Sequence, residues 1–223
     1  MRRLLAVLLF LTVLFGKLDA QVNPISQFLF DDYQETLILY KDGRQFAAPV
    51  NFDLLEGHFL FIDAKDKQPK QFANPEMIAL LRMGSRCFLL GEGEAVEVLQ
   101  AEPLFQVAYS GNLRQAPKSL SYGGSTQTAA VDTYVGYSGG GGGTLGSKQQ
   151  SRHKMVVGIN KNYKCEIGSK TRRFYDQKTF LKAFPKERRM QVEEYISQHE
   201  IDFGNVQQVY ELYMYIQSLG KNE

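Results

Sequence analysis

The stretch ETLILYKDGRQFAAPVNFD, residues 35–53, indicates how the first half of the chain folds. β-Prone residues fill Glu35–Tyr40, and the Asp42-Gly43 pair that follows is a strong short-range signal for a tight hairpin turn. A second β-prone run then continues to Val50. The stretch therefore predicts two antiparallel strands joined by a tight turn.

Similar runs continue along the chain at intervals of roughly ten residues, a spacing that is typical of small antiparallel barrels and sandwiches. They are His58–Asp63, Met77–Met83, Arg86–Leu90, Ala95–Leu99 and Leu104–Tyr109. In the first of them, Phe59 and Phe61 fall on one face of the predicted strand. Met77–Met83 could instead form a turn or two of helix, because short apolar runs do not separate the two structures. We expect residues 21–110 to form a small antiparallel β-barrel or sandwich.

A composition change marks the next segment. Residues 111–150 are rich in Gly, Ser, Thr and Gln and include five consecutive glycines at 139–143. Such a segment buries too little apolar surface to offset the entropy of ordering it, so we expect a flexible linker. The order Gly146-Ser147-Lys148 does not match a phosphate-binding loop, in which Lys precedes Ser or Thr. The sequence therefore predicts no nucleotide cofactor.

The remaining residues, 151–223, predict a small α+β domain. His153–Asn160 and Tyr163–Gly168 are expected to form a hairpin, with Lys170–Tyr175 as a third strand. Asp176 is expected to cap a short helix and Pro185 to begin another. The fold class predicted for the whole chain is α+β.

Apolar residues at helical spacing define the expected core of the last two helices. The first set is Met190, Val192, Tyr195 and Ile196, and the second is Val206, Val209, Tyr210, Tyr213 and Ile216. Asn205 is expected to cap the last helix and Gly220 to end it.

The N-terminus carries the pattern of a secretory signal peptide. Two arginines precede the apolar run Leu4–Phe15, and small or polar residues follow up to Ala20. The run is shorter than the roughly 20 residues that a membrane-spanning helix needs, which makes a retained anchor the weaker alternative. We expect cleavage after Ala20 and a secreted or periplasmic protein without a transmembrane span.

Charge is unevenly distributed over the two predicted domains. Residues 21–150 carry 10 basic and 14 acidic side chains, whereas residues 151–223 carry 13 basic and 9 acidic ones. A basic cluster predicts either a solvated face or the binding of an anionic partner, such as a lipid head group, an acidic polysaccharide or an acidic protein. Nucleic acid also binds such clusters, but it is not expected as the partner of an exported protein. The cluster consists of Lys170, Arg172, Arg173, Lys178, Lys182, Lys186, Arg188 and Arg189.

The sequence offers few residues for catalysis or metal binding. It contains no HExxH, H-x-x-x-H or CxxC motif, so we expect no metal site and no cofactor. Its two cysteines, Cys87 and Cys165, lie in predicted strands. They are either two free thiols or one disulfide, which an oxidising compartment would permit.

Two parts of the chain together resemble a known group of proteins. The elements ILYKDGRQFAAPVNFD, HFLFID and GSRCFLL resemble the β-rich N-terminal domain of small uncharacterised secreted or envelope proteins of gram-negative bacteria. The pattern from Tyr163 to Ile216 is similar to the C-terminal part of such proteins. The resemblance covers most of residues 33–110 and 160–216. It implies a β-rich domain followed by a hairpin and helices, and it implies no catalytic residue.

These observations predict a non-enzymatic interaction protein of the bacterial envelope. Its two modules, joined by a flexible tether, would bind envelope partners or anionic surfaces. The alternative is an envelope hydrolase whose dispersed residues form a site only in the fold.

Overall fold

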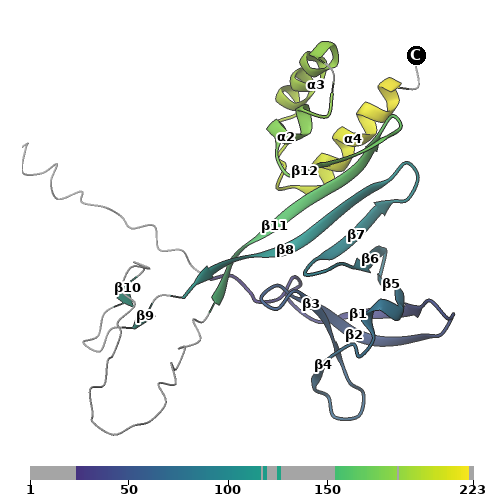
Figure 1. The fold of residues 1–223 in the computed structure, drawn as a ribbon, viewed down its shortest axis with the longest axis vertical. Coiled ribbons are helices and arrows are strands. Elements are labelled where there is room, and N and C mark those ends of the chain that lie inside the picture. The colour runs from purple at the N-terminus through teal and green to yellow at the C-terminus, as the bar shows by residue number, and fades with distance from the viewer. Residues whose placement is uncertain (1–23, 117, 120–124, 127–153, 185, 221–223) are drawn as a thin grey trace, which may run out of the picture.

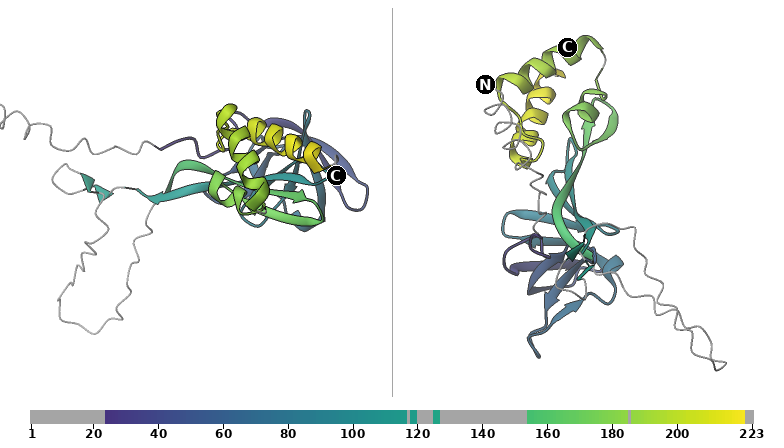
Figure 2. Two further views of the ribbon diagram at one scale, coloured as in Figure 1. Left: turned by 90° about the horizontal axis from the view of Figure 1, so that it is seen from above. Right: turned by 90° about the vertical axis from the view of Figure 1, so that its left-hand side faces the viewer.

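The computed structural model describes residues 24–116, 118–119, 125–126, 154–184 and 186–220. These residues form one large antiparallel sheet and three C-terminal helices, which confirms the mixed α+β class (Figure 1). Figure 2 shows the helices gathered at one end of the molecule, which we call the helical end, and the curled strands at the other, which we call the sheet end.

The elements follow the chain in this order: β1 Gln34–Tyr40, β2 Gln45–Asp53, β3 His58–Ile62, β4 Pro69–Gln71, a 3₁₀ turn Pro75–Met77, β5 Ile78–Met83, β6 Arg86–Leu90, β7 Ala95–Gln100, β8 Phe105–Gln115, β9 Lys118–Ser119, β10 Ser125–Thr126, β11 Lys154–Ile167, β12 Lys170–Phe174, α2 Gln177–Leu181, α3 Lys186–Gln198 and α4 Val206–Gly220. In the large sheet the strands lie in the order β12-β11-β8-β7-β6-β5-β1-β2-β3-β4. Met77–Met83 is mostly strand, because Thr36 to Tyr40 of β1 pair with it.

The sheet end curls strongly around its own core. The rings of Phe59 in β3 and Phe88 in β6 lie 6.2 Å apart, although three strands separate them in the sheet. Beside them, Gly111 of β8 approaches the end of β2 so closely that a Cβ atom there would lie 2.2 Å from the carbonyl oxygen of Leu54. The strand pairing of the described residues nevertheless ends at β12 and β4, so the predicted barrel is an open, curled sheet.

The N-terminal segment Pro24–Phe30 spans the gap between two sheet strands that are not neighbours. The backbone N–H of Ile25 donates to the carbonyl oxygen of Val156 in β11 (3.0 Å), and that of Leu29 donates to Phe52 in β2 (3.0 Å). The segment thus connects distant strands of the curled sheet by backbone hydrogen bonds.

Two buried polar side chains of β2 hold this segment. The Asn51 side chain accepts the N–H of Phe30 and donates to its carbonyl oxygen, at 3.2 and 2.9 Å. The Asp53 carboxylate accepts from Gln27 at 2.7 Å and from the N–H of Leu55 at 2.8 Å. Because these buried polar groups are hydrogen-bonded, they favour one placement of the segment.

A charged cluster lies within the sheet end. Glu97 accepts two hydrogen bonds from Arg86, at 2.7 and 2.9 Å, and a third from the Tyr109 hydroxyl at 2.7 Å. The Arg86 guanidinium also lies over the rings of Phe30 and Phe88, 5.1 and 4.9 Å from their centroids. Burial, and next the bond to Glu97, raises the pKa of Tyr109 well above its ordinary value, so Tyr109 remains the donor.

The long strands β8 and β11 join the two ends of the molecule. They pair from Lys154 opposite Gln115 to Cys165 opposite Phe105. The predicted boundary between residues 110 and 111 therefore falls inside β8, and the described residues of both predicted domains share one sheet. Residues 117, 120–124 and 127–153, with most of the predicted linker and its glycine run, lie outside the described residues, and the division into independently folding domains stays a prediction.

The predicted hairpin between His153–Asn160 and Tyr163–Gly168 is wrong, because the described part of both runs belongs to the single 14-residue strand β11. The polar residues Asn160 to Asn162 resemble a turn, but each pairs with a residue of β8 and the ladder continues through them. The hairpin lies one step later, where Gly168, with a φ of 62°, turns the chain into β12.

Aromatic side chains fill the core beneath the helices. Phe105, Tyr163, Phe174 and Phe180 are buried there, and the rings of Phe174 and Phe180 lie 4.6 Å apart. In α4 the predicted positions Val209, Tyr213 and Ile216 are buried, and the Asn205 side chain caps the helix by accepting from the N–H groups of Gln207 and Gln208, as expected.

The expectation for Met190 in α3 is wrong, because its side chain is 78% exposed. Val192 and Ile196, four residues apart, are buried on one face of α3. Met190 is two residues from Val192, about 200° around the helix, so it lies on the opposite face.

Candidate functional site

The predicted basic cluster lies on three consecutive elements at the helical end of the molecule. Between residues 170 and 189 the chain carries eight basic and two acidic side chains. The basic residues fall on β12 (Lys170, Arg172, Arg173), α2 (Lys178), the turn after it (Lys182) and α3 (Lys186, Arg188, Arg189). We call the exposed part of this cluster the basic surface, and it consists of Lys170, Arg173, Lys178, Lys182 and Lys186.

A turn and a helix cap determine where the basic surface lies. The turn at Gly168 returns the chain alongside β11 and so makes β12 the last strand of the sheet. Asp176 then caps α2, as predicted: its carboxylate accepts from the N–H of Thr179 at 2.7 Å, and the Thr179 hydroxyl accepts from the N–H of Asp176 at 3.1 Å. These bonds begin α2 shortly after β12, so Lys178 of α2 follows the strand closely in the chain.

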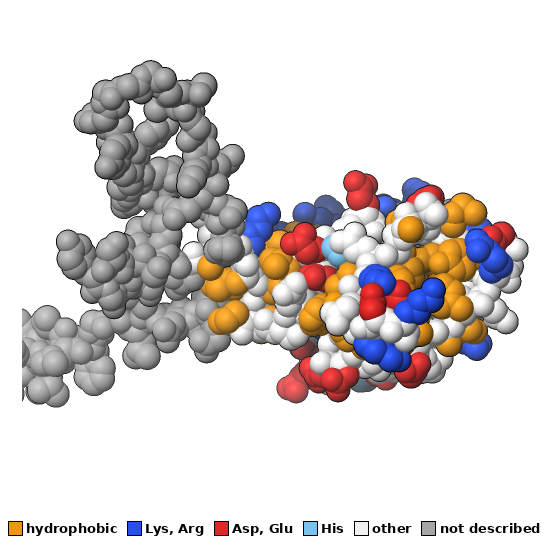
Figure 3. All heavy atoms as spheres, turned by 90° about the horizontal axis from the view of Figure 1, so that it is seen from below, with side chains coloured by type: hydrophobic (Ala, Val, Ile, Leu, Met, Phe, Trp, Pro, Cys, Tyr) orange, Lys and Arg blue, Asp and Glu red, His pale blue; other side chains and the backbone are white. Residues whose placement is uncertain are grey.

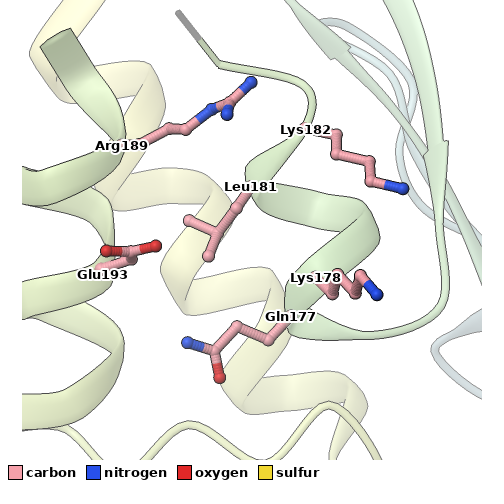
Figure 4. Close-up of a pocket in the computed structure, with 6 residues that line it drawn as sticks. All are labelled: Gln177, Lys178, Leu181, Lys182, Arg189 and Glu193. Atoms are coloured by element: carbon pink, nitrogen blue, oxygen red, sulfur yellow. The ribbon is translucent and has the colours of Figure 1, made fainter. Parts of the chain in front are cut away.

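An open groove of about 450 Å³ lies between α2 and α3. Figure 4 shows Gln177, Leu181 and Glu193 directed into the space between these helices, whereas the ammonium groups of Lys178 and Lys182 point to the other side of α2. The groove is therefore lined by polar, apolar and acidic side chains together. The two lysines contribute their charge to the outer surface instead.

The five residues of the basic surface form no ion pair with any described acidic residue. The sheet end differs, because its ion pairs join Arg44 to Asp42, Lys70 to Asp63 and Asp66, and Arg86 to Glu97. Figure 3, which views the molecule from below, shows basic and acidic side chains intermixed on that face. Exposed cations without an ion pair also occur at the sheet end, among them Lys41, Lys65 and Lys67, so what distinguishes the helical end is the density of such residues along the chain between Lys170 and Lys186.

Two of the predicted cluster residues turn inward instead. Arg189 donates from Nε to the carbonyl oxygen of Phe184 at 2.9 Å and so supports the connection between α2 and α3. Arg172 lies directly opposite Cys165 in the sheet, and its Nε atom is buried without a hydrogen-bond partner among the described residues.

The cysteines are free thiols in the structure, so the disulfide alternative is not formed. Strands β7 and β8 lie between Cys87 in β6 and Cys165 in β11. Three strand spacings amount to roughly 14 Å, about twice the Cα separation that a disulfide allows. Burial raises the pKa of the Cys165 thiol to about 12, which makes it an unreactive core residue.

Sequence reasoning missed Lys164, which lies opposite Arg173 in the sheet. The signal was present in the Gly168-Ser169 turn, because a two-residue turn fixes which residues of the two strands face one another. The predicted hairpin within β11 concealed that register.

Comparisons with protein-family models, curated proteins and solved structures found no match to this chain. Within the described ranges, no three His, Cys, Asp or Glu side chains are placed to hold a metal ion. None of the helices in the described part of the chain is both long and apolar enough to cross a membrane.

Proposed function

We propose that the protein is a non-enzymatic interaction protein of the bacterial envelope, secreted or periplasmic, and that its basic surface binds an anionic partner. The observation that carries this proposal is the set of five exposed cations without ion-pair partners among the described residues. These charges lie on consecutive elements at one end of the molecule, and their summed potential attracts an anionic group.

The sequence predicted two separate binding modules, but β8 of the first pairs with β11 of the second. Since this pairing joins both predicted modules in one sheet, we propose that the partner binds one body rather than two independently moving modules.

No specific observation favours the alternative of an envelope hydrolase. The hollow between α2 and α3 and a second one beside Asn160–Asn162 of β11 are both open to solvent. The buried carboxylates of Asp53 and Glu97 are hydrogen-bonded to protein groups, which gives each a structural role.

The test is retention of the chain from Gln21 on an immobilised anionic polymer, dextran sulfate. We expect the protein to be retained at low salt and released as salt screens the charges, with a screening length of about 10 Å at 0.1 M salt. Substituting Gln at Arg173, Lys178, Lys182 and Lys186 should abolish retention.

The matched control is a second variant with Gln at Lys41, Lys65, Lys67 and Lys154, which are exposed and lie outside the cluster. It has the same net charge as the first variant, and we expect it to be retained as the unmodified protein is. Equal loss of retention in both variants would attribute binding to net charge alone and contradict the proposal.

A further inference from the structure

Strand β12 has one backbone edge that faces away from the sheet. Ile167 and Lys170 flank a two-residue turn and therefore form a hydrogen-bonded pair. Pairs of this kind recur at every second residue, which directs the N–H and C=O groups of Arg172 toward β11. The backbone groups of Thr171 and Arg173 consequently point outward from the sheet.

This outward edge is uncovered in the described structure. Thr171 and Arg173 are both exposed, and the backbone of neither forms a hydrogen bond to a described residue outside the sheet. The opposite edge of the sheet differs: β4 is three residues long, begins with Pro69, and carries a Lys70 that is bound to two aspartates. Short length, proline and charge are features that protect an edge from pairing, and β12 has only charge.

The charges around this edge favour an acidic neighbour. Arg173 lies opposite Lys164 in a pair that is not hydrogen-bonded, the arrangement in which side chains approach most closely. Like charges in such a pair destabilise the sheet. An acidic side chain on an added strand would lie about 5 Å from Arg173 and relieve this repulsion.

We propose that the edge of β12 binds an extended acidic segment of a partner protein as an additional strand. The backbone of the segment bonds to Thr171 and Arg173, and its carboxylates, at alternate positions, lie on the face of the sheet that carries Arg173. The inference rests on the proposed function and names the anionic partner as an acidic peptide. A second copy of β12 fits poorly, because three cations would face three cations across the new pairing.

The experiment uses a nine-residue peptide of alternating glutamate and threonine, with blocked ends, and the chain from Gln21. Fluorescence anisotropy of the labelled peptide measures its affinity for the unmodified protein, Thr171→Pro and Thr171→Val. Proline removes the outward N–H of residue 171 but no bond to β11, so we expect affinity about tenfold weaker or more for Thr171→Pro. Thr171→Val keeps the N–H and should bind as the unmodified protein does.

A second measurement separates strand addition from simple charge attraction. The same peptide with N-methyl groups on alternate residues keeps its charge but loses backbone donors, and we expect its affinity to fall about tenfold or more as well. Binding of the unmethylated peptide should also slow hydrogen exchange at the amides of Thr171 and Arg173. If Thr171→Pro does not fold, as judged by circular dichroism, the methylated peptide and the exchange measurement decide the question.

Three outcomes would overturn the inference. Unchanged affinity with the methylated peptide, together with weaker binding to Arg173→Glu, would show charge attraction without strand addition and leave the proposed function standing. Failure to bind both the peptide and dextran sulfate would contradict the inference and the proposed function together. A dimer of the unmodified protein in light scattering that Thr171→Pro converts to a monomer would assign the edge to a second copy of the chain.

Discussion

The sheet end and the helical end use charged side chains in different ways. At the sheet end, Arg86 and Glu97 bind each other and the Tyr109 hydroxyl, and Lys70 bridges Asp63 and Asp66. At the helical end the core is aromatic and the basic surface has no acidic partner among the described residues. The difference teaches that charges satisfied within the fold support its structure, whereas charges left unpaired can act on other molecules.

The largest expected effect tests whether the two ends unfold together. Phe180 under the helices and Phe88 in the curled sheet are both fully buried. Replacing either by Ala should lower the free energy of unfolding by about 3–5 kcal/mol, through lost burial and the cavity that remains. Because β8 and β11 join the two ends, we expect one urea transition for each variant, detected alike by far-ultraviolet circular dichroism and tyrosine fluorescence. Two transitions, of which each variant shifts only one, would instead support independently folding domains.

A smaller effect is expected from the charged cluster of the sheet end. Glu97→Ala leaves the guanidinium of Arg86 and the Tyr109 hydroxyl without their shared acceptor. Since the Arg86 side chain is 40% exposed, water compensates in part, and we expect a loss of about 2–3 kcal/mol in urea unfolding. Asp42→Ala, which breaks the exposed pair with Arg44, is the matched control and should change the free energy of unfolding very little.

The smallest effect concerns the cap of α2 and depends on pH. Hydrogen bonds from the side chain and then the backbone N–H of Thr179 lower the pKa of Asp176. A carboxylate whose pKa is lower in the folded state stabilises the fold above its ordinary pKa of about 3.9, and that contribution disappears as the pH falls through the folded pKa. Asp176→Ala should therefore melt at a lower temperature than the unmodified protein at neutral pH. The two melting temperatures should converge in strong acid, and a difference that persists there would exclude the ionised cap as its cause.

Local sequence patterns predicted the elements well where the interactions that form them are also local. The Asp42-Gly43 turn, the shared face of Phe59 and Phe61, and the cap at Asp176 each depend on residues a few positions apart. The continuity of β11 through Asn160–Asn162 depends on β8, a strand more than forty positions away in the chain, and no local pattern contains it. The open sheet was missed for the same reason, since closure depends on how distant strands curl.

The sequence predicted which residues form the basic cluster, but not where their side chains lie in the fold. The eight basic residues were identified from their density in the sequence, but the structure separates the exposed ones from Arg172 and Arg189, which turn inward. Whether a basic side chain faces water or the core depends on strand register and helix packing. Lys164 is brought opposite Arg173 only by the register of β11 with β12.

The bridge made by the N-terminal segment constrains the order in which the fold can be completed. Ile25 and its partner Val156 are 131 positions apart, so a ribosome must add most of the chain before that hydrogen bond can form. Because synthesis starts at the N-terminus, Ile25 has no Val156 to bond to while β1 to β8 are being made. Contacts between such distant positions form slowly, because a long loop must close before they contribute. The bond between Ile25 and Val156 is thus a late event, and the curled sheet lacks this connection until most of the chain has been made.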